Sequence, residues 1–133
     1  TLFKYFLFTA LLLWGQAYAA TGPYDESADA KAELHTSLQE AQTTSKPILV
    51  VFGANWCGDC KVLDQAFKTG QSAALIQKNF KVVKVNVGRF DRNVDIAEGY
   101  GLPLKKGIPA VAILAPSGAV KMLTAAIQTT AGR

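Results

Sequence analysis

Side chains that bind metals are scarce in this chain of 133 residues. It has only two cysteines, Cys57 and Cys60, and a single histidine, His35. A structural zinc site needs about four ligands, and the chain has no second cysteine pair to complete one. His35 lies off the apolar stripe of its predicted helix, so we expect it at the surface. The sequence therefore implies no metal site, and nothing in it implies an organic cofactor.

A strong charge of one sign is also lacking. The 14 basic and 10 acidic residues give a formal net charge of +4 and are scattered, with Lys105-Lys106 as the only adjacent basic pair. The absence of a basic stripe with interleaved aromatic residues argues against nucleic acid as a partner. Mixed charges at a helix start usually form a solvated surface. We interpret one such group in this way: Arg89, Asp91, Arg92 and Asp95.

No apolar run near the start reaches the roughly 20 residues of a comfortable membrane span. The run Tyr5–Trp14 follows Lys4 and precedes Ala17-Tyr18-Ala19. A basic start, a short apolar core and an A-x-A end are typical of a secretory signal peptide. We expect residues 1–19 to be cleaved after Ala19, which would leave no membrane anchor. The alternative is an uncleaved anchor, because the basic start is a single lysine.

The two cysteines lie close together, in the run Trp56-Cys57-Gly58-Asp59-Cys60-Lys61. The apolar run Pro47–Phe52 before them predicts a buried strand. Apolar residues after them recur at helical spacing, at Val62, Leu63, Ala66 and Phe67. The cysteine pair is therefore predicted where a strand turns into a helix.

That position predicts a reactive pair. Residues three apart on a helix share one face and can close a disulfide. The first cysteine faces the unpaired N–H groups of the helix start, which favour a thiolate. A thiolate beside a second thiol is typical of thiol–disulfide exchange. Two alternatives remain: a purely structural disulfide, which would stabilise little because it closes so few residues, and a pair of unreactive core thiols.

The rest of the chain predicts one layered α/β domain, residues 29–133, after a mobile leader at 20–28. Ser27 or Asp29 can cap a first helix that runs to about Gln42, followed by a loop over Thr43–Lys46. The helix after Cys57 is expected to run to about residue 68, and two further helices are expected at 72–79 and 94–100. Asp91 or Asn93 can cap the last of these. The remaining strands are expected at 80–87 and, as a hairpin, at 109–114 and 119–125. This order predicts a central mixed β-sheet flanked by helices.

This pattern resembles the thioredoxin superfamily, and within it the small secreted thioredoxin-like proteins of bacteria with a WCGDC motif. The resemblance covers about Lys46 to Ala125 and rests on the WCGDCK segment, Lys84-Val85-Asn86-Val87 and Gly107-Ile108-Pro109. It implies a thioredoxin-like fold in which Cys57 is the nucleophile and Cys60 the buried resolving thiol. It also implies a cis Ile108–Pro109 bond packed against the dithiol.

The chain departs from the family pattern at several positions. The family's buried carboxylate, six residues before the nucleophile, is replaced by Val51, while its usual basic neighbour is kept as Lys84. The usual proline between the cysteines is Asp59, whose charge should raise the pKa of the thiolate, and Lys61 opposes this effect. Two extra residues occur in Gly101–Gly107. The family's closing helix is expected to be missing, because Ile127–Arg133 is short and polar.

We therefore predict a monomeric periplasmic or secreted thiol–disulfide oxidoreductase that reduces the disulfides of client proteins. The client would bind a rim formed by Asn55, Trp56, Ile108 and Pro109, although Trp56 alternatively covers the core. A membrane-borne thiol electron donor would reduce the pair again. The competing hypotheses are a non-catalytic binding or adaptor module on the same scaffold, and a net disulfide oxidase.

Overall fold

A computed structural model describes residues 22–124 of the chain. The predicted signal peptide, the start of the predicted leader and the segment Ile127–Arg133 lie outside the described residues. Within residues 22–124, no helix is long and apolar enough to cross a membrane.

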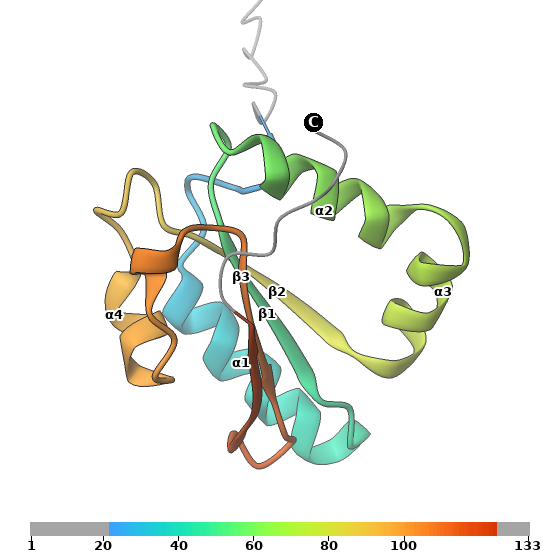
Figure 1. Cartoon of the computed structure of the whole chain (residues 1–133). Helices are drawn as coiled ribbons and strands as arrows, with labels where there is room; N and C mark the ends of the chain where they lie inside the picture. The colour runs from blue at the N-terminus through green and yellow to red at the C-terminus, as the bar shows by residue number, and fades with distance from the viewer. Residues whose placement is uncertain (1–21, 125–133) are drawn as a thin grey trace, which may run out of the picture.

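Four strands form one mixed sheet in the order β2-β1-β3-β4 (Figure 1). Strand β1 (Ile48–Gly53) pairs in parallel with β2 (Lys81–Asn86) and antiparallel with β3 (Ala110–Leu114), and β3 pairs antiparallel with β4 (Val120–Thr124). Every residue of β1 is buried, as its unbroken apolar sequence predicts. The predicted α/β architecture with a central mixed sheet is confirmed.

Helices cover both faces of the sheet (Figure 1). Their bounds are α1 (Ala30–Thr44), α2 (Gly58–Lys68), α3 (Gly70–Asn79) and α4 (Val94–Gly99), with a 3-10 helix η1 (Leu104–Lys106) before β3. Successive side chains of a strand point to opposite faces. Ile48, Val50 and Phe52 accordingly join the main core with α1 and α4, whereas Leu49 and Val51 pack with α2 and α3.

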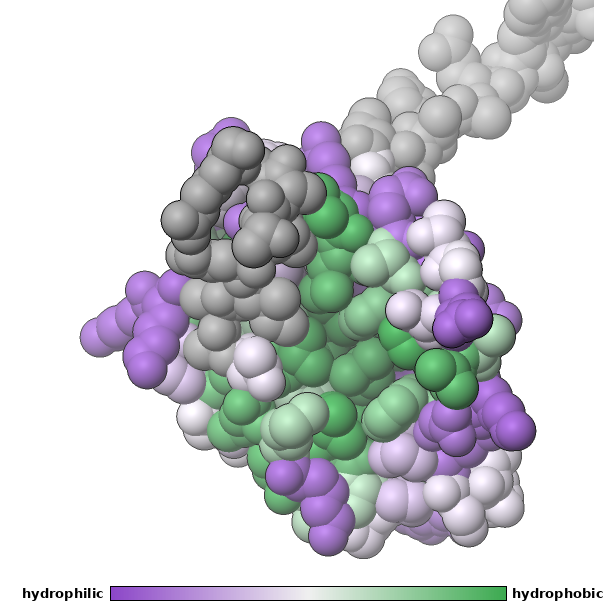
Figure 2. All heavy atoms as spheres, turned by 45° about the vertical axis from the view of Figure 1, so that its right-hand side comes forward, coloured by the Kyte–Doolittle hydropathy of each residue, from purple (hydrophilic) through white to green (hydrophobic). Residues whose placement is uncertain are grey.

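Figure 2 looks onto the side that carries α2 and α3 and shows apolar residues gathered at its centre. The apolar cluster on this face of the sheet is built around Leu49, Val51 and Val111, with partly buried residues of α2 and α3. Strand β4 is exposed: Met122, opposite Ile113, lies on this face, whereas Val120 and Leu123 lie opposite Leu114 and Ala112, whose side chains belong to the core on the other face.

Helix α1 extends further than predicted. Asp29, one of the two proposed caps, accepts a hydrogen bond from the Ala32 N–H. The loop prediction for Thr43 and Thr44 is wrong, because the helix runs to Thr44 and ends at the left-handed cap residue Ser45 (φ 57°). The hydroxyls of Thr43 and Thr44 both donate to the Glu40 carbonyl. Hydroxyl groups can satisfy such carbonyls locally. His35 is exposed, as expected.

Three other predictions need correction. Asn93 occupies the N-cap position of α4, but its side chain donates to the Asn86 carbonyl and makes no cap bond. Helix α3 begins at Gly70, two residues earlier than predicted, and β2 is one residue shorter at each end.

The buried face of α2 also differs from the predicted one. Leu63 and Phe67 pack on the sheet as expected, whereas Val62 and Ala66 are exposed. The buried residues of α2 are Cys60 and Asp64. These two residues lie one turn apart on α2, so the helix buries a cysteine and a carboxylate beside each other as well as apolar side chains.

Candidate active site

The cysteine pair lies where β1 passes into α2, as predicted. Cys57 is the N-cap residue of α2, and the two cysteines form a disulfide with their Cα atoms 5.2 Å apart. The Cys60 backbone N–H points at the Cys57 sulfur, 3.2 Å away. A cap position normally satisfies one of the free N–H groups of a helix start. Here a sulfur does so, and the same N–H would stabilise a thiolate on Cys57.

The two cysteines differ in exposure. Cys57 is 6% exposed and Cys60 is 1% exposed, so both are largely covered and Cys57 is the more accessible. Cys60 lies one turn inside α2, beneath Tyr24 and Ile108. This order matches the roles that the family resemblance implies, with Cys57 as nucleophile and Cys60 as resolving thiol.

The loop before β3 faces the pair from the other side. The Ile108–Pro109 peptide bond is cis, which confirms the bond implied by the resemblance. The Ile108 carbonyl oxygen lies 3.7 Å from the Cys57 sulfur, and the Ile108 side chain packs against the cluster that contains both cysteines. Pro109 is fully buried, so of the two residues Ile108 is the one that a bound chain can contact.

Trp56 forms an exposed edge of the site, because 48% of its surface is accessible. Its indole N–H donates to the Gly88 carbonyl at 2.7 Å. Its ring meets Phe90 edge-on, with centroids 6.1 Å apart, and the Arg89 guanidinium carbon lies 5.9 Å from the ring. These contacts fix the ring outside the core, which favours the predicted rim over the alternative that Trp56 covers the core.

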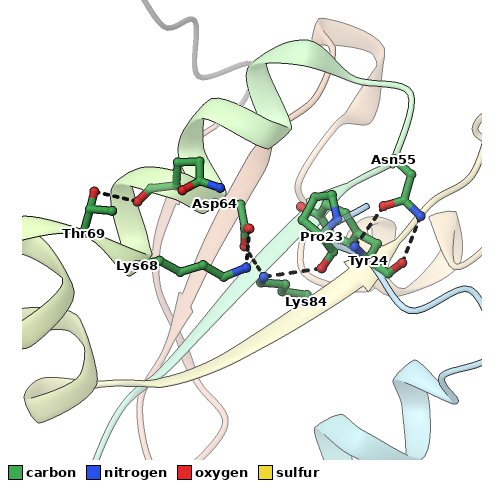
Figure 3. A network of polar contacts seen from close by, with 8 residues as sticks. Pro23, Tyr24, Asn55, Asp64, Lys68, Thr69 and Lys84 are labelled. Carbon is green, nitrogen blue, oxygen red and sulfur yellow. Dashed lines mark hydrogen bonds and ion pairs between the residues drawn. The ribbon is translucent and has the colours of Figure 1, made fainter. Parts of the chain in front are cut away.

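Asn55 binds the N-terminal segment of the chain. Its side-chain oxygen accepts from the Tyr24 N–H, and its amide donates to the Tyr24 carbonyl, both at 2.9 Å (Figure 3). Asn55 therefore anchors the N-terminal segment to the site, and its contact with a client stays a prediction.

Tyr24 itself was not foreseen as a site residue. It belongs to the segment for which the sequence predicts a mobile leader, yet its ring is 3% exposed and packs against both cysteines. Burial raises the pKa of its hydroxyl well above the usual value, and the negative charge of Asp64 raises it further. The hydroxyl therefore stays protonated throughout the working pH range and can donate a hydrogen bond.

Lys84 is placed beside the site, but its partner comes from an unexpected element. Its ammonium group pairs with Asp64 of α2 and donates to the Pro23 carbonyl at 3.3 Å (Figure 3). Lys68, one turn further along α2, also bonds Asp64, at 2.6 Å. Val51, which stands where the family has its carboxylate, is buried and apolar. The buried carboxylate of this site is therefore Asp64 of α2, while β1 has the apolar Val51 at the position of the family's carboxylate.

The ionisation of Asp64 reflects this environment. Burial alone would raise the pKa of its carboxyl, but the hydrogen bonds and charges of Lys68 and Lys84 outweigh burial and lower it. Asp64 is therefore a carboxylate at neutral pH. No sequence pattern singled it out, because a polar residue on an amphipathic helix is expected on the solvent side. Its spacing of four residues from Cys60 was the available signal.

The two remaining modulating residues lie at the start of α2. Asp59 is half-buried in the first turn, and Lys61 is exposed. Their positions put both charges within the first turn, where the helix dipole favours an acidic residue.

Two hollows flank the rim. An apolar one of about 600 Å³ lies between α4 and η1 and is lined by Phe90, Val94, Glu98, Pro103, Leu104, Lys105 and Gly107. Its wall includes part of the loop with two extra residues, Gly101–Gly107. A more polar one, of about 480 Å³, borders Trp56 and Asn55. The first hollow continues the surface formed by Trp56 through their shared neighbour Phe90.

Comparison with known proteins agrees with this geometry. A family model described as thioredoxin-like matches residues 29–116. A disulphide isomerase from Xylella fastidiosa Temecula1 has a crystal structure that is 46% identical, with a TM-score of 0.75 over 79% of this chain and 80% of that one. Thioredoxin 1 of a Nostoc species is 34% identical over 104 residues, which are 78% of this chain and 90% of the relative.

A shorter but closer match is to the thiol:disulfide interchange protein DsbD of Campylobacter jejuni. It is 47% identical over 51 residues, which are 37% of this chain and only 9% of that protein. The chain therefore corresponds to a small part of that relative. The matched family model, the solved neighbour and the disulfide at the start of α2 lead to one conclusion: the chain belongs to the thioredoxin-like family of thiol–disulfide oxidoreductases.

Proposed function

We propose that the protein is a periplasmic or secreted reductase of disulfides in client proteins. One observation carries this proposal: the more accessible cysteine, Cys57, receives the helix-start N–H of Cys60 on its sulfur and lies beside the Ile108 carbonyl. That arrangement activates one sulfur for attack and leaves the other, Cys60, behind it to complete the reaction.

The reaction proceeds in two exchanges. The Cys57 thiolate attacks one sulfur of the client disulfide, which forms a mixed disulfide and releases the client's second sulfur as a thiolate. The Cys60 thiolate then attacks the Cys57 sulfur, which closes the Cys57–Cys60 bond and releases the reduced client. Two electrons pass from the pair to the client, and the proton of Cys60 leaves to solvent.

The client contacts Trp56 and the backbone at Ile108, in the loop that precedes β3. Extended peptide bound along such a loop uses backbone hydrogen bonds for affinity and pockets for specificity. The apolar hollow between α4 and η1 lies next along this surface, and it would accept an apolar side chain of the client. Asn55 lines the polar hollow beside Trp56, and Pro109 follows Ile108 in the same loop, so both remain proposed members of the rim.

The proposed location and partner are supported by the signal-peptide pattern at residues 1–19 and by the similarity to part of DsbD, a thiol:disulfide interchange protein. We infer that a membrane-borne thiol donor in the same compartment reduces the pair. Intact-mass measurement of the exported protein tests the location. Cleavage after Ala19 is expected, and it would leave Tyr24 in the mature chain. A retained Tyr5–Trp14 segment would contradict the soluble periplasmic protein.

Insulin reduction by the purified protein tests the activity. The protein with both cysteines should precipitate insulin chains in the presence of dithiothreitol faster than dithiothreitol alone, and Cys57→Ser should not. Equal rates for the two proteins would favour the adaptor hypothesis, which rests on the loss of the strand carboxylate at Val51 and on the altered loop Gly101–Gly107. The equilibrium with glutathione then separates a reductase from a net oxidase.

A further inference from the structure

The N-terminal segment that precedes α1 is built into the active site. Five hydrogen bonds hold residues 23–26, and none of their partners lies in that segment or in α1. Asn55 bonds the Tyr24 N–H and carbonyl, Lys84 bonds the Pro23 carbonyl, Arg92 bonds the Glu26 carbonyl at 2.9 Å, and Asn55 reaches the Glu26 carboxylate at 3.4 Å. A segment held so closely is positioned to act on the cysteines beneath it.

The hydroxyl of Tyr24 reaches the resolving cysteine. Gly53, the last residue of β1, has no side chain, and the Tyr24 hydroxyl fills the place that a Cβ would take there. A Cβ added there would collide with the Tyr24 hydroxyl oxygen and would lie 2.9 Å from the Cys60 sulfur. The hydroxyl and the sulfur therefore both lie close to the Gly53 backbone, and any side chain at position 53 would force at least one of them to move.

Resting on the function proposed above, we propose that Tyr24 is a positioning residue for the second exchange: its hydroxyl donates a hydrogen bond to the Cys60 thiolate and stabilises it. A thiolate is a far better acceptor than a disulfide sulfur, so this bond strengthens when the pair is reduced. Tyr24 gives up no proton in the step. It lowers the pKa of Cys60, and solvent takes the Cys60 proton.

The charges around Cys60 make such a donor useful. Asp64, four residues further along α2, is a buried carboxylate that disfavours a second negative charge nearby. Lys84 of β2 and Lys68 of α2 offset that charge by pairing with it. Cys57 carries the client during the second exchange and is then uncharged. Tyr24 is then a neutral hydroxyl close to the Cys60 sulfur that can donate to it.

Tyr24→Phe tests the proposal, because it keeps the ring and removes only the hydroxyl. One hydrogen bond to a charged group corresponds to about one pKa unit. The matched control is Tyr100→Phe, a half-buried tyrosine that packs against the main core. Reduced protein is mixed with dithiobis(nitrobenzoate), which releases one coloured thiolate when Cys57 attacks and a second when Cys60 closes the disulfide.

The expected signature is a crossing of two pH profiles. A thiolate with a higher pKa is less abundant but more nucleophilic, with a Brønsted coefficient of about 0.5, so Tyr24→Phe should slow the second release about threefold near neutral pH and speed it about threefold once both proteins are ionised. The first release should be unchanged, and Tyr100→Phe should match the unmodified protein at every pH. A merely structural role for Tyr24 would not produce a crossing.

Titration of the Cys60 thiol tests the role of Tyr24 independently of the kinetics. In the Cys57→Ser background, thiolate absorbance reports Cys60 alone, and Tyr24→Phe should raise its pKa by about one unit. An unchanged pKa would overturn the role of Tyr24 and leave the proposed function standing. Loss of the first release in the unmodified protein would instead overturn the proposed function.

Discussion

Replacement of Asp64 by asparagine should destabilise the protein far more than a surface change. The carboxylate is 7% exposed and accepts from two ammonium groups, those of Lys84 and Lys68. The exposed Lys68 pair contributes little. The bond to the partly buried Lys84 is a charge-assisted one of about 1.5–3 kcal/mol, and its loss leaves that lysine without its carboxylate. We therefore expect Asp64→Asn to lower the free energy of unfolding by about 2–3 kcal/mol.

Urea and thermal unfolding of the oxidised protein measure this loss. A domain of this size should show a Tm lowered by about 10 °C or more, since each kcal/mol shifts Tm by about 4–8 °C. Asp95→Asn is the matched control, because Asp95 pairs with Lys31 at 2.7 Å and both side chains are exposed. That variant should unfold like the unmodified protein.

The loss should also depend on pH with a definite sign. The pKa of Asp64 is lowered in the folded protein, so its stabilisation is complete above the ordinary aspartate pKa of about 3.9 and disappears as the pH falls through the lower folded value. The difference between Asp64→Asn and the unmodified protein should therefore be constant near neutrality and shrink in acid. Equal unfolding of Asp64→Asn and Asp95→Asn at neutral pH would refute the reasoning.

Three further predictions concern the cysteines and their surroundings. In a short iodoacetamide pulse on the reduced protein, Cys57 should be alkylated before Cys60, and peptide mapping that found equal labelling would contradict the assigned roles. Asp59→Asn removes a negative charge beside the nucleophile and should lower the Cys57 pKa and raise the reduction potential measured against glutathione; no change in either would remove the local support for a reducing role. Gly53→Ala should cost about 1–3 kcal/mol by overpacking, and Tyr24→Phe in the same protein should recover part of that loss in urea unfolding; a larger loss in the double variant would show that the hydroxyl does not fill the space.

Much of the fold could be predicted from local sequence. The apolar run of β1, the helix start at the cysteines and the turn before β4 each leave a pattern within a few residues of chain. The same is true of the cysteine pair, whose spacing and position predict its chemistry. The cis bond at Ile108–Pro109 needed the family resemblance, because local sequence alone gives an X–Pro bond only a small chance of being cis.

The residues that were missed act over long sequence distances. Tyr24 meets Asn55 across 31 positions, and Asp64 meets Lys84 across 20. A polar leader and a charged residue on a helix both indicate solvent when each is taken alone. Only the packing of α2 over β2 and of the leader over β1 turns them into site residues. The bonds of Asn55 to the leader are likewise not visible in the sequence, which predicts only its place on the client-binding rim.

Mass spectrometry of trapped intermediates tests the central claim most directly. Reduced Cys60→Ser protein mixed with oxidised glutathione should gain one glutathione on Cys57, and the adduct should persist because no resolving thiol follows. The unmodified protein should pass through that adduct to the Cys57–Cys60 disulfide and keep no glutathione, while Cys57→Ser should react slowly. An adduct that forms as fast on Cys60 in Cys57→Ser as on Cys57 in Cys60→Ser would contradict the account.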